Sequence, residues 1–310
     1  MWSKLGILFL SILLILIIIP LLINEFLSQS EDVSPQLLKV FNHQTGQIMQ
    51  MELEEYLRGV VAAEMPAIYH TEALKAQAVA ARTYAVRQLS QFGGSGTQKY
   101  NGADLSTDYA DCQAYISEEQ MKEKWGFVSF FYHWAKINKA VEETSGQVLV
   151  HKNSLIEAVY HANSGGMTEA AEYVWGNQSS YLQSVDSPFD SLSERNFKRI
   201  ETFSINDFVK IFNIDKSKGV SEIEILNVSK SGRVLEIRID NKSYTGKEVR
   251  ELLDLPSTKF EIDKNGSSIE VNTYGYGHGV GLSQDGANGL AQNGYDYQQI
   301  LHHYYTDVEI

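Results

Sequence analysis

Cysteine is almost absent from this sequence, because its 310 residues include only Cys112. A single thiol cannot form an intramolecular disulfide, and a closed zinc site built mainly on thiolates is disfavoured as well. Positive charge is also scarce: 26 Lys and Arg stand against 39 Asp and Glu, for a formal net charge of −13. This balance argues against nucleic acid as a partner. An anionic polymer would have to bind locally, in a cleft with its own basic groups.

One long hydrophobic run is present, over residues 5–23. At about 1.5 Å per residue a helical run of this length is roughly 28 Å long, close to the thickness of the bilayer core. A cleaved signal peptide is the alternative, but the run is too long for one and no small-x-small site follows it. Lys4 precedes the run and Glu25 follows it, so the positive-inside rule places the rest of the chain outside the cytoplasm.

The remainder predicts an α+β fold, with mixed helices and antiparallel sheet. The expected elements are a hairpin over residues 37–51 turning at 42–46, helices over 53–64, 72–89 (N-capped by Thr71) and around 135–140, an irregular segment over 97–118, strands over 147–150 and 155–160, and a helix through Ile300. Residues 203–270 differ from the rest in that apolar and polar residues alternate as in strands. Thr245 and Glu248 form a capping-box pattern there. The predicted organisation is an anchor at 1–23, a stalk at 24–36, a core in two parts (37–202 and 271–310), and an α+β insertion at 203–270.

Glu64 stands out within the first helix. Leu53, Tyr56, Leu57 and Val60 form an apolar stripe, and Glu64 continues it about three turns after Leu53. Pro66 disfavours helical geometry at the residue before it, so the helix should end at about that point. Burial and the exposed carbonyls of the last turn would both raise the pKa of Glu64, which suits a general acid. The alternative is a structural Glu paired with Arg58 or Arg82.

Three segments carry the candidate chemistry. The first is residues 60–66 with the alanine-rich helix that follows, the second is Tyr160-His-Ala-Asn-Ser-Gly-Gly-Met-Thr168, and the third is Tyr274-Gly-Tyr-Gly-His-Gly-Val-Gly-Leu-Ser-Gln284-Asp-Gly-Ala. Glycines flank polar side chains in the last two, which permits tight turns and close approach to a ligand. The candidate binding residues from these segments are Gln77, Arg82, Tyr84, Tyr160, His161, Ser164, Gly165, His278, Ser283 and Gln284. Arg82 would either neutralise an anionic group or brace two helices, and Tyr160, Tyr274 and Tyr276 would stack on sugars or pack in the core.

In this order and spacing the three segments, together with Thr144-Ser-Gly-Gln-Val-Leu149 and Ile300-Leu-His-His-Tyr-Tyr305, resemble the stage II sporulation protein D family. The resemblance implies a membrane-anchored lytic transglycosylase that cleaves peptide-stripped peptidoglycan glycan strands during forespore engulfment. It places the protein in the mother-cell membrane, with its catalytic domain facing the intermembrane space. It also implies an anchored cell-wall amidase and a multi-span membrane scaffold as partners, and it places the family's catalytic acid on Glu64.

The implied chemistry needs only one carboxylic acid. Ordinary glycosidases use two carboxylates, whereas a lytic transglycosylase uses the sugar's own 6-hydroxyl group as nucleophile. Glu64 would protonate the glycosidic oxygen and then accept the 6-hydroxyl proton, which closes a 1,6-anhydro ring. Five other acids are weaker candidates that we interpret as solvated or structural: Asp108, Asp111, Glu157, Glu169 and Glu172.

Two alternatives and one negative expectation complete the prediction. The chain also resembles amidase-enhancer modules, so it could bind glycan and activate an amidase without cleaving anything, and a hydrolytic glycosidase is a third possibility. Members of the family can carry a zinc-type cluster, but a single cysteine does not supply one. We therefore expect no metal and no cofactor.

Overall fold

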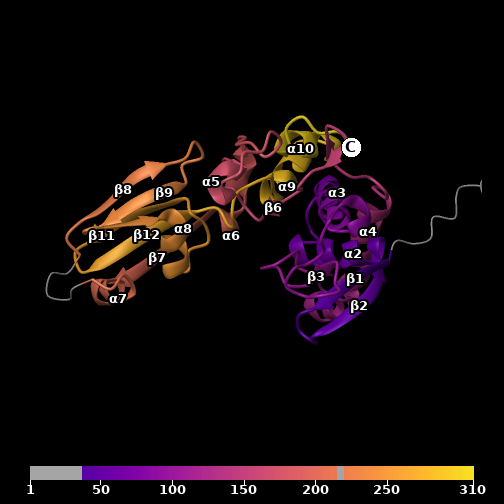
Figure 1. Cartoon of the computed structure of the whole chain (residues 1–310), viewed down its shortest axis with the longest axis horizontal. Helices are drawn as coiled ribbons and strands as arrows, with labels where there is room; N and C mark the ends of the chain where they lie inside the picture. Colours follow the sequence, from indigo (N-terminus) through magenta and orange to yellow (C-terminus); the bar gives the residue numbers. More distant parts are fainter. Residues whose placement is uncertain (1–36, 215–219) are drawn as a thin grey trace, which may run out of the picture. The chain divides into compact units, whose positions relative to one another are not determined.

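A computed structural model describes residues 37–214 and 220–310 (Figure 1). The predicted anchor and stalk lie outside the described residues. Within the described ranges, no helix combines the length and the apolar character needed to cross a bilayer.

A hairpin and three helices form the first part of the fold. The elements are strands β1 (Leu37–Asn42) and β2 (Gln47–Glu52), helices α2 (Leu53–Glu64), α3 (Thr71–Arg87) and α4 (Glu118–Glu142), and the short strand β3 (Leu105–Ser106). The hairpin is confirmed, and β3 adds to it by pairing in parallel with β1. Helix α4 covers the predicted 135–140 region but begins much earlier, at a capping box on Ser117, and it kinks at Gly126, whose φ is 72°.

Helix α2 has the predicted boundaries and the predicted buried face. Leu53, Tyr56, Leu57 and Val60 all belong to the main hydrophobic core. The helix ends at Glu64, because Met65 before the proline adopts extended geometry.

Helix α3 differs slightly from its prediction. Its N-cap is His70 rather than Thr71, since the His70 ring nitrogen accepts a hydrogen bond from the Glu72 backbone N–H. The helix ends at Arg87, two residues before Leu89. Its alanines are buried, and their small side chains allow α2, α4, α9 and α10 to pack against it.

The strands predicted over 147–150 and 155–160 are wrong in extent. The structure contains only two-residue strands there: β4 (Val150–His151), β5 (Ser154–Leu155) and β6 (Tyr160–His161). Leu149 and Ile156 are buried in the core, but the Leu149 backbone N–H donates to the Thr83 hydroxyl group and Val150 pairs with Glu309. The segment is apolar because it crosses the core, and its backbone bonds go to other segments instead of a long ladder.

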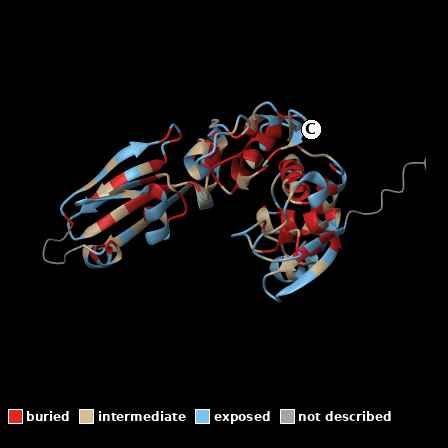
Figure 2. Ribbon diagram, viewed as in Figure 1, coloured by how far each residue is buried: buried red, intermediate tan, exposed pale blue. Residues whose placement is uncertain are grey.

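Residues 198–274 form two three-stranded antiparallel sheets with two helices. The elements are β7 (Lys198–Ser204), α7 (Ile205–Ile211), β8 (Ile223–Val228), β9 (Val234–Ile239), β10 (Lys242–Thr245), α8 (Gly246–Leu252), β11 (Phe260–Asn265) and β12 (Ser268–Tyr274), with strand orders β10-β9-β8 and β11-β12-β7. The capping box of Thr245 and Glu248 is confirmed at the start of α8. These elements bury their own hydrophobic cluster, separate from the main core (Figure 2). The division of the chain at residue 203 stays a prediction.

The C-terminal segment returns to the main core. Short strand β13 (Leu282–Ser283) pairs in parallel with β6, and helices α9 (Gln284–Gln292) and α10 (Tyr297–Tyr304) follow. Helix α10 confirms the expected helix through Ile300. Short helices α5 (Ala171–Trp175) and α6 (Glu194–Phe197) precede β7 in sequence, and Ala171 of α5 belongs to the main core. The mixed α+β fold is confirmed, with two parallel strand pairs that were not expected beside the antiparallel ones.

Candidate functional site

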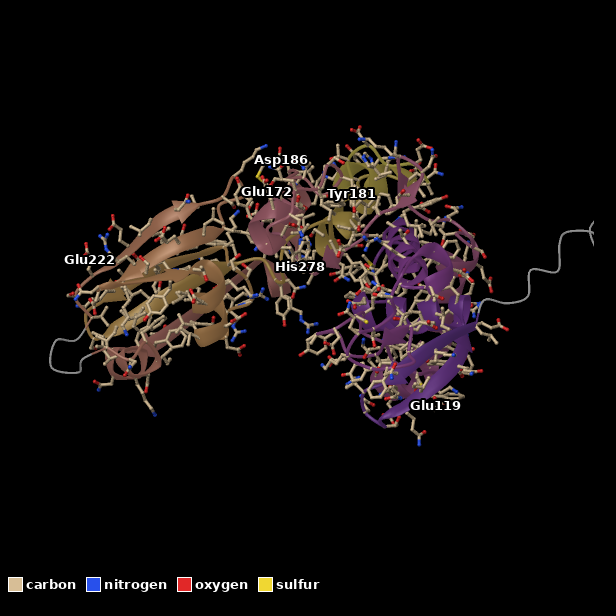
Figure 3. All side chains as sticks on the ribbon, viewed as in Figure 1. Glu119, Glu172, Tyr181, Asp186, Glu222 and His278 are labelled. Atoms are coloured by element: carbon tan, nitrogen blue, oxygen red, sulfur yellow. The ribbon has the colours of Figure 1, made fainter. Side chains whose placement is uncertain are left out.

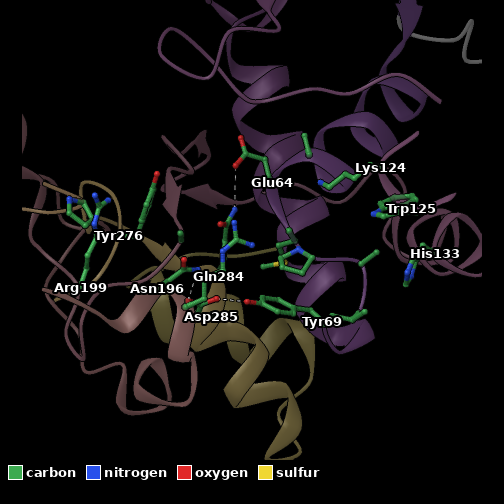
Figure 4. Close-up of a pocket in the computed structure, with 18 residues that line it drawn as sticks. Glu64, Tyr69, Lys124, Trp125, His133, Asn196, Arg199, Tyr276, Gln284 and Asp285 are labelled. Atoms are coloured by element: carbon green, nitrogen blue, oxygen red, sulfur yellow. Dashed lines mark hydrogen bonds between the residues drawn. The ribbon is translucent and has the colours of Figure 1, made fainter. Parts of the chain in front are cut away.

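A cleft of about 610 Å³ lies at the end of helix α2 (Figure 4). Its walls come from α2 and the loop after it, from α4, from α6 and the start of β7, and from the start of α9. The polar side chains that line it are those of Glu64, Tyr69, Lys124, His133, Arg195, Asn196, Arg199, Tyr276, Gln284 and Asp285.

Glu64 is held at the wall of this cleft by two donors. The backbone N–H of Ala114 donates to Glu64 Oε1 at 2.7 Å, and Gln284 Nε2 approaches Oε2 at 3.5 Å. The first is a strong hydrogen bond and the second lies at the limit of hydrogen bonding. Oε1 is therefore fixed as an acceptor, and Oε2 is the oxygen available to carry a proton.

The carboxyl group of Glu64 has a raised pKa. Burial is the largest cause, because it disfavours the charged form, and the hydrogen bonds from Ala114 and Gln284 oppose it in part. The direction agrees with the prediction from the apolar stripe.

The alternative of a structural ion pair does not fit the contacts of Glu64. Arg58 contacts Asn138 and Glu142, and Arg82 binds Glu54. Neither arginine is paired with Glu64 among the described residues.

Asp285 is the other carboxyl group that lines the cleft. It accepts hydrogen bonds from Tyr69, from Asn163 Nδ2 at 2.9 Å and from Asn196 Nδ2 at 3.0 Å. These three donors occupy the oxygens of the Asp285 side chain as acceptors. Asp285 therefore joins the loop after α2 to α6 and α9.

Several predicted binding residues gather behind Glu64. Gln284 is the first residue of α9, whose N-cap is Ser283. Its side chain donates to Gln77 Oε1 at 3.2 Å, and the Gln77 side chain is fully buried. The Tyr160 hydroxyl group donates to Gln113 at 2.7 Å, and the pKa of Tyr160 is raised mainly by burial and next by the charge of Glu64. Gln284 lines the cleft, and Gln77 supports it from below.

The second segment is largely buried beneath the cleft. The Ser164 side chain is fully buried, and its hydroxyl group donates to Asp190, as does that of Ser283. Gly165 has a φ of 73°, and a Cβ atom there would lie 3.1 Å from the backbone of Tyr274. The structure therefore places Ser164, Gly165 and Ser283 in the framework that holds the two glycine-rich segments together, away from the cleft lining.

His161 and His278 lie side by side with ring centroids 5.5 Å apart. His278 Nε2–H donates to the Tyr160 carbonyl oxygen at 3.0 Å, and its Nδ1 accepts from the Val280 N–H at 3.1 Å. Burial and the nearby charge of Arg233 lower the pKa of His278 to about 4, and burial lowers that of His161 well below its ordinary value. Both imidazoles are therefore neutral at physiological pH. His278 fixes the backbone of Tyr160, and the His161 ring contacts the carbonyl oxygen of Val280.

Arg82 and Tyr84 also lie away from the cleft. The Arg82 side chain is 1% exposed, binds both carboxylate oxygens of Glu54 and donates to the carbonyl oxygens of Val141 and Gln147. These contacts correspond to the alternative in which Arg82 braces helices. Tyr84 lies beside Cys112, and burial raises the pKa of that thiol.

Three cationic residues of the cleft were not predicted. Lys124 lies on α4, Arg195 on α6 and Arg199 on β7. The pKa of Lys124 is lowered by partial burial and by Arg195, which places these two charges close together. Arg199 pairs with Glu201 at 2.7 Å, whereas Arg195 forms no ion pair with another described residue. Their signal in the sequence was weak, because each belongs to an element with an ordinary surface pattern.

The weaker carboxylate candidates lie outside the cleft lining. Asp108 and Asp111 lie near Lys99, and Glu169 is buried among Ser229, Ser231 and its own neighbouring backbone. Within residues 37–214 and 220–310 no cluster of three His, Cys, Asp or Glu side chains is arranged to hold a metal ion.

Comparison with known proteins gives a consistent result. A family model described as "Stage II sporulation protein" matches residues 41–151. The stage II sporulation proteins D of Bacillus amyloliquefaciens and Bacillus subtilis (strain 168) are 37% and 38% identical to this chain, over 89% of its length and 79% of theirs. An amidase enhancer of Bacillus subtilis is 30% identical over 82% of this chain and 40% of its own length.

Proposed function

The chain belongs to the stage II sporulation protein D family, and from this premise we propose that it is a peptidoglycan lytic transglycosylase with Glu64 as its acid. The observation that carries the proposal is a single carboxyl group of raised pKa at the wall of a cleft. The substrate would be a peptide-stripped glycan strand, and the products would end in 1,6-anhydro-N-acetylmuramic acid.

The raised pKa supports the first step, in which protonated Glu64 donates to the glycosidic oxygen between N-acetylmuramic acid and N-acetylglucosamine. The C–O bond to the leaving sugar breaks as positive charge develops on the muramyl ring. Oε2 is the oxygen with the weaker protein contact, so it is the proton donor in this scheme.

The second step uses the same side chain as a base. The Glu64 carboxylate accepts the proton of the 6-hydroxyl group as that oxygen bonds to the anomeric carbon, and the ring closes. The donors on Ala114 and Gln284 stabilise the carboxylate during this interval. No second acid is needed, which agrees with the three hydrogen bonds that occupy Asp285.

The charge of the cleft suits this substrate. Removal of stem peptides leaves a free lactyl carboxylate on each muramic acid, and the whole chain, at −13, would repel such a polymer. Lys124, Arg195 and Arg199 supply local positive charge beside Glu64.

We further propose the membrane placement and partners that the sequence predicts. Residues 1–23 would anchor the domain in the mother-cell membrane, with residues 24–310 in the intermembrane space. An anchored amidase would remove the stem peptides first, and a multi-span membrane protein would hold both enzymes together.

A non-catalytic role is the second candidate, and the similarity to an amidase enhancer favours it. In that case the cleft would bind glycan and the protein would activate an amidase without cleaving a glycosidic bond. A hydrolase would cleave but would add water.

The mass of the products separates these functions. Peptide-free glycan strands digested with the full-length protein should yield fragments one water lighter than hydrolysis products. Glu64→Gln should still bind the strands but should lose about 10²- to 10⁴-fold in rate, the usual contribution of a general acid. Hydrolysed products, intact strands, or cleavage by the Gln variant at the parental rate would each contradict the proposal.

A further inference from the structure

A second pocket of about 790 Å³ lies beside the cleft, and none of the residues that line it lines the cleft. Helix α5 forms one side and helix α8 another. Two aromatic side chains of α5, Tyr173 and Trp175, line it and are 47% and 46% exposed. Large aromatic side chains that stay half exposed in a concave site are typical of ligand pockets.

The pocket and the cleft share a wall. Tyr276 lines the cleft, and His278, two residues later, lines the pocket. In the same way, Pro256 lines the cleft and the preceding Leu255 lines the pocket. The Gly277 N–H donates to the Pro256 carbonyl oxygen at 3.0 Å, which joins the two segments into one partition. This partition therefore borders both the cleft and the pocket.

A chain of contacts also links the pocket to Glu64. The ring centroids of Trp175 and His278 lie 5.3 Å apart. His278, which is labelled in Figure 3, donates to the Tyr160 carbonyl oxygen. The pKa of Tyr160 responds to the charge of Glu64, so these two side chains are close. The two sites are therefore neighbours within one folded unit.

The polar lining suits an uncharged sugar. Lys247, Arg250 and Arg233 are balanced by Glu169, Glu251 and Asp254, and hydroxyl groups come from Thr245 and Thr258. Lys247 lies 4.0 Å from Glu251. Donors and acceptors of both signs beside exposed aromatic faces match the hydroxyl and acetamido groups of an N-acetylhexosamine.

The floor of the pocket is polar as well. The Arg233 side chain is 1% exposed, and its Nη2 donates to the Ser164 carbonyl oxygen at 3.0 Å. Its Nε and Nη1 have no partner among the described residues. Buried donors without partners are rare in native proteins, and a polar floor of this kind is unsuited to an apolar ligand.

We propose that this pocket is a second carbohydrate subsite, which holds an N-acetylglucosamine unit of the strand beyond the partition. The inference rests on the proposed function, since it assumes that a glycan strand occupies the cleft. It predicts that the protein binds long strands more tightly than short ones because only long strands reach both sites.

The test measures binding without cleavage, in full-length Glu64→Gln protein in detergent. The probes are β-1,4-linked N-acetylglucosamine oligomers, a tetramer and an octamer, and the measurement is calorimetric Kd. Trp175→Ala and Tyr173→Ala should each weaken octamer binding about three- to tenfold, the range expected for one lost aromatic contact. The tetramer should be unaffected.

Tyr295→Ala is the matched control, because Tyr295 is 42% exposed and lines neither site. Because Trp175 contacts His278, its removal would also disturb the contacts that lead to Glu64. The Tyr173 variant separates this indirect effect from a lost sugar contact, since Tyr173 is not paired with the His278 ring. Equal losses for both oligomers, no loss in either variant, or no preference of the parent for the octamer would overturn the inference. A failed transglycosylase assay with a preserved octamer effect would instead contradict the proposed function and leave the subsite standing.

Discussion

At the scale of single residues, the protonation of Glu64 decides whether the proposed chemistry works. Its pKa is raised by burial, so the protonated form persists to a higher pH than that of a surface glutamate. The rate of strand cleavage should be greatest below this pKa and should fall about tenfold per pH unit above it. Initial rates of anhydro-product formation across pH 4–9 measure this. A profile that rises through the same range would identify Glu64 as a base in the free enzyme.

The raised pKa of Glu64 also predicts how the stability of the folded protein depends on pH. A carboxyl group whose folded pKa exceeds its unfolded pKa contributes stability below the unfolded value and loses it as pH rises through the folded value. Glu64→Gln, which cannot ionise, should therefore raise the unfolding midpoint at pH 8 and change it little at pH 4. Urea or thermal melts at both values test this. The control is Glu119→Gln, because the pKa of that exposed carboxyl group is lowered instead.

The sequence predicted that Glu64 lies on the buried face at the end of its helix, but it did not predict most of the polar residues that line the cleft beside it. Glu64 lies on a regular helical stripe, and periodicity is a local property that the sequence displays directly. Asp285 and Arg195 reach the cleft only because α9 and α6 fold back toward α2. For Arg82 the sequence left two roles open, and its contacts match the bracing role, because its burial against Glu54 depends on the packing of α2 and α3.

At the scale of elements, helix α9 was not predicted because its glycines disfavour helix. The structure explains them by close packing. A Cβ atom on Gly286 would lie 2.1 Å from the Tyr304 hydroxyl oxygen and 2.3 Å from Ser187 Oγ, and one on Gly289 would lie 2.2 Å from Phe189. The glycines lower the helix propensity of α9, but they allow the close packing that holds Gln284 at the cleft.

Gly286→Ala should therefore destabilise the protein despite alanine's better helix propensity. Overpacking typically costs about 1–3 kcal/mol, more than the roughly 1 kcal/mol gained from propensity. Chemical denaturation measures the difference, and Gln292→Ala, at an exposed position of the same helix, is the control. An unchanged or increased stability of Gly286→Ala would show that Tyr304 and Ser187 move aside to accommodate a methyl group.

The strands were predicted unevenly for a related reason. Alternating patterns in β8 and β9 belong to sheets whose partners are close in sequence, and the capping box at α8 is local. The residues over 147–160 are apolar because they cross the core. Hydrophobic periodicity alone cannot distinguish an irregular segment that passes through the core from a buried strand.

At the scale of the whole molecule, net charge and cleft charge have opposite signs. The chain carries −13 overall, yet Lys124, Arg195 and Arg199 line the cleft. Composition alone predicted that any anionic polymer must bind in a local basic site, but it could not say which residues form one, because they come from three separate elements. Broad repulsion with local attraction favours strands that enter the cleft over polymers that adsorb elsewhere.

Arg195 is the residue that tests this arrangement, because it forms no ion pair with another described residue. Arg195→Gln should weaken binding of peptide-stripped glycan strands to the Glu64→Gln protein by about two- to fivefold, the range of an exposed charge pair. Binding of uncharged N-acetylglucosamine oligomers should not change, and the difference should shrink between 0.05 and 0.5 M salt as screening increases. Arg238→Gln is the control, since Arg238 is half-buried on β9, pairs with Glu222 and Glu224, and lines neither the cleft nor the second pocket. A salt-independent loss that is equal for charged and uncharged ligands would mean that Arg195 supports the shape of the cleft, and that the lactyl carboxylate is read by another group.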